Sequence, residues 1–167
     1  MVALRMVRLI ETHSDKIARD LLVKIRRSSR TREMERVREP ELLASSQELL
    51  QHLSEWLLTK TSDDIEVRYR AIGARLLRQG VPLADACWAA IMTKEYLWDF
   101  LQKQGFLRSP IELYGEMELL CLLNHFFDHA LCHMAEGYEY ERQKSSAHTH
   151  RELASKVREL NLAAFVP

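Results

Sequence analysis

Glycine, proline and cysteine are all scarce in this chain of 167 residues, which has five glycines, four prolines and three cysteines. So little turn-forming material favours a few long helices over many short strands. An odd number of cysteines, with no zinc-type CxxC pair, argues against a disulfide framework and for a reducing compartment. No apolar run approaches the roughly 18 to 20 residues of a membrane span. The N-terminal segment has no signal-peptide core, because Arg5, Arg8 and Glu11 interrupt it. We therefore expect a cytoplasmic protein that does not associate with membranes.

Net charge is also absent, since Lys and Arg together number 24 and Asp and Glu together number 24. A neutral chain has no global basic field to attract nucleic acid, so no nucleic-acid partner is predicted. One segment, 26–39, does hold six arginines and has almost no apolar face. We interpret it as a solvated connection or a frayed helix end, because a basic run needs aromatic or motif support to indicate nucleic-acid binding.

Apolar residues, which are abundant, recur at helical spacing along most of the chain. The pattern predicts helices at 2–28, 40–60, 62–79, 83–104 and 109–143, and no convincing strand. Gly73 falls inside the third of these, where it costs about 1 kcal/mol relative to alanine, so we expect it to mark the close approach of another helix. After Gln143 we expect a polar break and then a short amphipathic piece. The predicted fold is an all-α, globin-like bundle of about five main helices in residues 1–143, with a polar linker and helical C-terminal extension in 144–167.

The helix 109–143 has the clearest start, because Ser109 suits the N-cap, Pro110 the first helical position and Glu112 a capping box. Its apolar stripe contains Leu123, Phe126, Phe127, Ala130 and Met134.

A row of three histidines four residues apart, His125, His129 and His133, lies on the same helix. Neighbours in such a row could chelate one divalent cation. On a helical wheel, however, the apolar stripe is centred about 170° from His125, and only His133 flanks it. A haem ligand must project into an apolar pocket, and a closed metal site needs three or four converging ligands. We therefore interpret the row as a polar face or a dimer contact, and keep a metal- or haem-binding sensor as the alternative.

Two charged residues fall where apolar residues are expected. Lys94 lies in the apolar stripe of helix 83–104, and Glu116 lies on the apolar side of helix 109–143. Because a buried lone charge is costly and is usually paired, one interpretation is a ligand pocket between these helices, formed by Lys94, Glu116 and Trp98. The other is that Lys94 extends to solvent or pairs with Glu116 or Asp128.

No nucleophile–base pair, phosphate loop or pair of carboxylates stands at a recognisable spacing. The sequence therefore predicts no catalytic residue, no cofactor and no enzymatic activity.

A set of helix-packing residues in the middle of the chain resembles the signature of a bacterial sensor family, the N-terminal domain of RsbR and RsbRD type. These residues are Arg70, Ile72, Gly73, Arg75, Gly80, Leu83, Ala90, Lys94, Leu97 and Trp98. The later segment FFDHALCHMAEGY is similar to the last helix of that family, and Ile10, His13 and Ile17 are compatible with its first. The resemblance covers about residues 5–143, and its motifs are packing patterns rather than catalytic residues.

The resemblance implies a haem-free, globin-like domain that forms a homodimer and acts as the sensory input of a stressosome protein or a histidine kinase. The residues after Tyr138 would correspond to the linker that leads to the output module. We expect that module, of STAS or kinase type, either in cis in a longer chain or in trans in a partner, because the sequence stops at Pro167. The family has no established ligand, so the resemblance does not name the signal.

Overall fold

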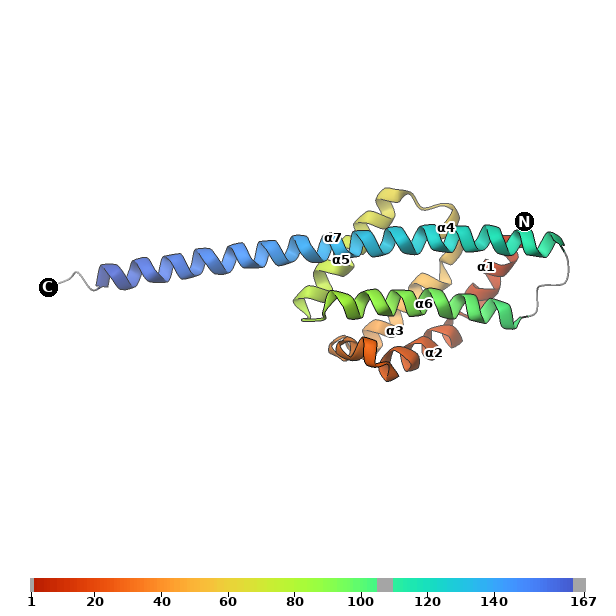
Figure 1. Ribbon diagram of the computed structural model, residues 1–167, viewed down its shortest axis with the longest axis horizontal. Coiled ribbons are helices and arrows are strands. Elements are labelled where there is room, and N and C mark those ends of the chain that lie inside the picture. Colours follow the sequence, from red (N-terminus) through yellow and green to blue (C-terminus); the bar gives the residue numbers. More distant parts are fainter. Residues whose placement is uncertain (1, 105–109, 164–167) are drawn as a thin grey trace.

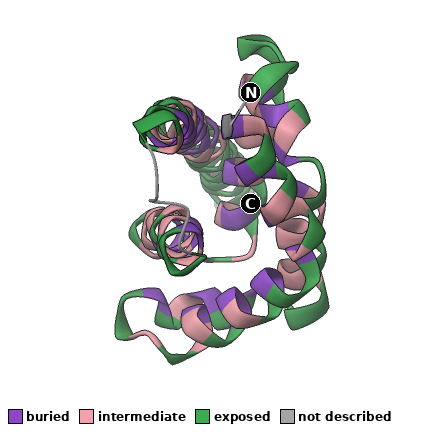
Figure 2. Ribbon diagram, turned by 90° about the vertical axis from the view of Figure 1, so that its right-hand side faces the viewer, coloured by how far each residue is buried: buried purple, intermediate pink, exposed green. Residues whose placement is uncertain are grey.

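A computed structural model of the chain describes residues 2–104 and 110–163, and every regular element in them is a helix. The predicted all-α bundle is confirmed. In chain order the elements are α1 (Val2–Thr12), α2 (Ser14–Arg27), the 3-10 helix η1 (Ser29–Arg36), α3 (Glu39–Gln51), α4 (Leu53–Leu58), α5 (Ser62–Arg78), α6 (Leu83–Lys103) and α7 (Pro110–Ala163). Figure 1 shows α6 and α7 side by side, and the turned view of Figure 2 shows the shorter helices packed on one side of this pair.

Both ends of α5 lie within one residue of the predicted helix 62–79. At the start, the Thr61 side chain accepts a hydrogen bond from the Asp64 N–H, and the Asp64 carboxylate accepts one from the Thr61 N–H. The hydrogen bond from the Thr61 backbone lowers the pKa of Asp64. Past the end, Gly80 has a φ of 74°, the left-handed conformation that glycine adopts without strain.

Two predicted helices are each broken in two, at His13 and at His52. The φ/ψ angles there are −103°/14° and −115°/25°, outside the helical range. The continuous helices expected at 2–28 and 40–60 are therefore wrong. The pieces pack differently: α1 lies against α7 and α4, whereas α2 lies against α3 and η1. Tertiary packing thus bends the chain where the sequence has neither glycine nor proline.

The arginine-rich segment 26–39 is an ordered connection built around η1, so it is not a frayed helix end. Its arginines other than Arg26 are exposed, as expected of a solvated connection, but part of the segment packs into the bundle. Thr31, Met34 and Val37 within it are all buried. The Arg26 guanidinium donates to the backbone carbonyls of Met34 and Val37, at 2.7 Å each. The Glu33 N–H donates to an oxygen of Asp85 in α6 at 2.9 Å. Arg26 thus holds the backbone of the connection in place.

The last helix, α7, is 54 residues long and has no break after Gln143. The expected polar break is wrong, because the segment contains no glycine or proline that would end a helix. Figure 1 shows the C-terminal half of α7 projecting well past the other helices. Residues 144–160 are exposed throughout. The division of the chain at 143 into domain and linker stays a prediction, and the N-cap role given to Ser109 falls outside the described residues.

The contact between α5 and α7 is backbone against backbone. A Cβ atom placed on Gly73 would lie 2.0 Å from the Met134 carbonyl oxygen, and one on Gly137 would lie 2.1 Å from the Arg70 carbonyl oxygen. The close approach predicted for Gly73 is confirmed, and Gly137 is its counterpart on α7.

Candidate functional site

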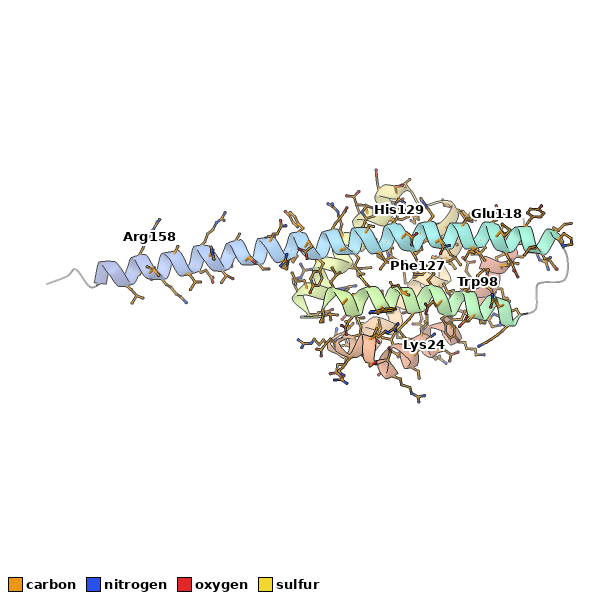
Figure 3. All side chains as sticks on the ribbon, viewed as in Figure 1. Lys24, Trp98, Glu118, Phe127, His129 and Arg158 are labelled. Carbon is orange, nitrogen blue, oxygen red and sulfur yellow. The ribbon has the colours of Figure 1, made fainter. Side chains whose placement is uncertain are left out.

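The histidine row lies on the outside of α7. His125 is exposed, His129 and His133 are half-buried, and the neighbouring rings are 4.2 and 6.2 Å apart between centroids. Figure 3 shows His129 and Phe127 on opposite sides of the helix. This placement agrees with the helical wheel. None of the seven histidines of the chain lines the central cavity described below.

One histidine of the row does meet carboxylates. The Nδ1 atom of His133 donates to Glu136 at 3.1 Å, and Glu66 of α5 lies close enough that the three ligand atoms are within 4.8 Å of one another. The Arg70 guanidinium contacts both carboxylates, at 2.9 Å from Glu136 and 3.3 Å from Glu66. Hydrogen bonds from His133 and Arg70 lower the pKa of Glu136. Arg70 already supplies the positive charge that a metal would bring, so the cluster is an ion-pair network. Whether the histidine row binds a metal stays a prediction.

The structure does not bring Lys94 and Glu116 together. The Lys94 ammonium lies 3.6 Å from the Asp128 carboxylate, one of the two pairings that the sequence allowed. Glu116 is 6% exposed and lies twelve residues before Asp128 on the same helix, about 18 Å along its axis. Trp98 is half-buried one turn after Lys94. None of Lys94, Trp98 and Glu116 lines the central cavity.

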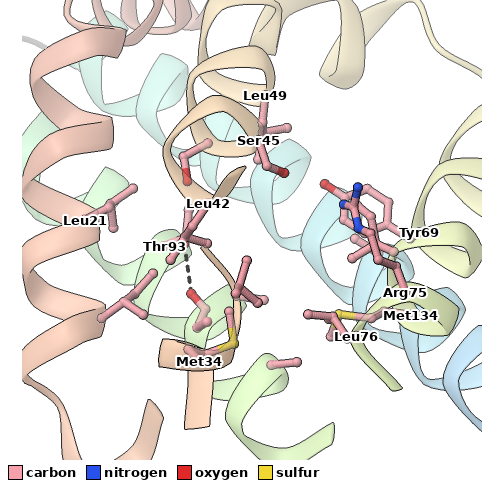
Figure 4. Close-up of a pocket in the computed structure, with 18 of the residues that line it drawn as sticks. Leu21, Met34, Leu42, Ser45, Leu49, Tyr69, Arg75, Leu76, Thr93 and Met134 are labelled. Carbon is pink, nitrogen blue, oxygen red and sulfur yellow. Dashed lines mark hydrogen bonds between the residues drawn. The ribbon is translucent and has the colours of Figure 1, made fainter. Parts of the chain in front are cut away.

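The cavity, of about 140 Å³, lies between α2, η1, α3, α5, α6 and α7. Figure 4 shows side chains from several of these helices around it. Most of its lining is aliphatic, sulfur-containing or aromatic, contributed by Leu21, Ile25, Met34, Val37, Leu42, Leu49, Leu50, Tyr69, Ile72, Leu76, Ala86, Ala89, Ala90, Phe127, Ala130, Leu131 and Met134.

The mouth of the cavity lies between α3 and α5, whose backbones make little direct contact. Arg75 pairs with Glu41 at 3.4 Å, and Arg68 pairs with Glu48. A surface hollow between the two helices shares all three of Glu41, Arg68 and Arg75 with the cavity. Sequence reasoning missed this mouth. Its signal is that the two glutamates, like the two arginines, stand seven residues apart and so share one helix face.

One wall of the cavity carries a phenol that burial holds in its neutral form. Burial raises the pKa of Tyr69 to about 12, while the nearby Arg68 partly opposes the shift. Burial, with a hydrogen bond to Asp20, also raises the pKa of Tyr96 to about 12.

This shift makes stability fall at alkaline pH. Below the unfolded pKa of about 10 the phenol is neutral in both states, so its contribution is fully present. Above it the unfolded chain ionises first, and the contribution is lost as the pH rises through the folded pKa. We expect Tyr69→Phe to remove one phenol from the late phase of a phenolate absorbance titration and to flatten this decline. An unchanged late phase would show that Tyr69 is not buried as described.

A second apolar surface runs along the outside of α7. The outer stripe consists of Tyr114, Met117, Cys121, Cys132, Leu153, Val157 and Leu160. At about 100° of rotation per residue, these positions lie roughly opposite the core residues Leu123, Phe126 and Ala130. The five large apolar side chains are 54–75% exposed, and both cysteines are exposed. The stripe therefore offers an uncovered apolar face at each end of the helix.

Comparison with known proteins gives a family match. A family model described as the RsbT co-antagonist protein rsbRD N-terminal domain matches residues 15–153. Neither the curated proteins nor the solved structures yielded a match. The matched range contains every residue that lines the cavity and its mouth. No helix in the described part of the chain is long and apolar enough to cross a membrane.

Proposed function

Because the chain belongs to the family of RsbT co-antagonist RsbRD N-terminal domains, a signal-transduction input domain of the stressosome type, we propose that it forms a parallel homodimer along the outer stripe of α7. In this proposal α7 then relays the signal from the bundle to an output module of STAS or kinase type, in cis or in trans. The role is non-enzymatic and cytoplasmic, and haem has no part in it.

The observation that carries this proposal is the projecting half of α7. Residues 144–160 are exposed, although a lone helical segment of this length is only marginally stable in water. Leu153, Val157 and Leu160 are spaced by four and three residues, the spacing of a two-stranded coiled-coil seam. A second copy would cover this seam with the same residues, because a two-fold interface is self-complementary.

The continuity of α7 supports the relay. Its inner face holds Phe127, Leu131 and Met134, which line the cavity. The same helix continues, with neither glycine nor proline after Gly137, into the projecting segment. A displacement of the inner face therefore has a rigid path out of the bundle.

Mild oxidation offers a test that uses the native cysteines. In a parallel dimer each cysteine of the outer stripe meets its own symmetry mate, so we expect Cys121–Cys121 and Cys132–Cys132 disulfides between copies. Cys121→Ser should retain the second link, and Cys87→Ser is the matched control, because Cys87 is not on α7. Mass spectrometry of the linked peptides identifies the pairing. Cys121 linked to Cys132 would instead indicate an antiparallel pair and overturn the proposal.

Introducing charged side chains into the seam tests whether it forms the dimer interface. Leu153→Asp together with Val157→Asp should weaken dimerisation by at least about 100-fold, since burial of these side chains is worth at least about 3 kcal/mol. Light scattering at a range of concentrations measures this effect. Arg151→Asp, which is exposed on another side of the helix, should leave the dimer intact. A wild-type chain that stays monomeric at high concentration would also contradict the proposal.

A further inference from the structure

We propose that the central cavity is a binding site for one small, uncharged, apolar molecule, of the size of a single aromatic ring or a short alkyl chain. The action of that molecule as the signal rests on the proposed function, whereas its binding does not.

The volume of the cavity sets the size of the molecule. A dry cavity of about 150 Å³ lined by aliphatic and aromatic side chains is known in another protein to take up benzene or xenon. The cavity here, of about 140 Å³, is of the same order. Met34 and Met134 line it, and their flexible side chains let the walls adapt to the shape of the occupant.

The lining sets the chemistry of the molecule. A buried water needs two to four polar partners, and the hydroxyl of Thr93 on the α6 wall already donates to the Ala89 carbonyl at 2.8 Å. The other polar lining residues all come from α3, α5 or the residue just after α5, the two helices that flank the mouth: Glu41, Ser45, Ser46, Arg68, Arg75 and Gln79. The positions from α2, η1, α6 and α7 are apolar apart from Thr93, so an apolar molecule against these walls replaces empty space without losing hydrogen bonds.

The mouth excludes charged molecules. Glu41 is paired with Arg75, and Glu48 with Arg68, so each charge at the entrance already has a partner from the opposite helix. An ion entering the cavity would lose its hydration and would have to displace one member of a pair to regain a counter-charge. A neutral molecule passes between the pairs without that cost.

Methionine methyl groups report on binding at several places at once. In NMR spectra of the full chain with labelled methionine methyls, titration with benzene should shift the signals of Met34 and Met134, because ring currents act on the cavity wall. The signals of Met6, which is buried in α1 but does not line the cavity, and of Met117, which is exposed on the outer stripe, should not shift. The site would be overturned if the chemical shifts of Met34 and Met134 did not change up to the solubility limit of benzene, or if only Met117 shifted.

A filled cavity provides the second test. Ala89→Leu places a larger side chain inside the cavity and should abolish the benzene shifts. Ala84→Leu makes the same change at an exposed position of α6 and should preserve them. Circular dichroism and thermal unfolding establish whether both variants fold. If Ala89→Leu does not fold, the benzene titration of the wild-type chain alone decides whether the cavity binds. Shifts that persist in a folded Ala89→Leu variant would overturn the site.

The binding site and the proposed function can fail separately. Benzene binding to a monomeric chain would uphold the site and overturn the dimer. A cross-linked dimer in which benzene does not shift the Met34 and Met134 signals would uphold the dimer and overturn the site.

Discussion

Alanine at Gly137 should lower the free energy of unfolding by about 3 kcal/mol or more, the upper end of what overpacking a core costs. An ideal Cβ there would lie 2.1 Å from the carbonyl oxygen of Arg70 and 2.6 Å from its Cα. Both are backbone atoms, so no side chain can rotate away, and α5 and α7 must separate. Separation would also strain the pairs Arg70–Glu136 and Arg78–Glu141, which join the same two helices.

The sign of this effect discriminates between two explanations. If Gly137 were merely a tolerated helix residue, alanine would stabilise the protein by about 1 kcal/mol through helix propensity. Urea unfolding followed by circular dichroism measures the difference, and stabilisation would contradict the contact. Ser145→Ala, in the exposed part of α7, is the control and should change stability by no more than about 0.5 kcal/mol.

Gly73→Ala should be similarly destabilising, because its Cβ would lie 2.0 Å from the Met134 carbonyl oxygen. The two substitutions should not be additive. Once one methyl group has moved the helices apart, the second meets a contact that is already broken. Additive losses in a double-mutant cycle would mean that the two glycines act on separate contacts.

The sequence predicted those parts of the fold that one segment determines. The bounds of helix 62–79 and the close approach at Gly73 each follow from a local signal, and the structure places both as expected. The breaks at His13 and His52 have no such signal, because they arise where the chain turns to follow different neighbours. The length of α7 was underestimated for a related reason: a loss of apolar spacing after Gln143 marks the end of the bundle, not the end of the helix.

The candidate site divides in the same way. The outward direction of the histidine row needs only the geometry of a single helix, so the helical wheel predicted it. The cavity and the ion pairs at its mouth depend on how α3 lies against α5, which no periodicity within either helix specifies. Lys94 lies between these two cases. Its possible partners could be named from the sequence, but only the packing of α6 on α7 selects Asp128 among them.

Phe126→Ala should cost about 3 to 5 kcal/mol of unfolding free energy, the usual range for truncating a buried phenylalanine. Phe126 is 1% exposed. Its ring lies 6.1 Å from that of Trp56 in α4 and 5.8 Å from that of Tyr69 in α5, centroid to centroid. Removing it therefore leaves a void where three helices meet, and rigid aromatic neighbours cannot close it. Phe126→Leu keeps most of the volume and should cost clearly less.

The fluorescence of Trp56 gives this prediction a local readout, because its indole would lose a packing partner and meet a more polar environment. Phe126 does not line the cavity, so the folded fraction of Phe126→Ala should still show the benzene-induced shifts of Met34 and Met134. A loss below about 1 kcal/mol would mean that the neighbouring rings collapse into the void. Loss of the benzene shifts in a folded variant would instead mean that the aromatic cluster and the cavity form one cooperative unit, so that the two could no longer be treated as separate parts of the core.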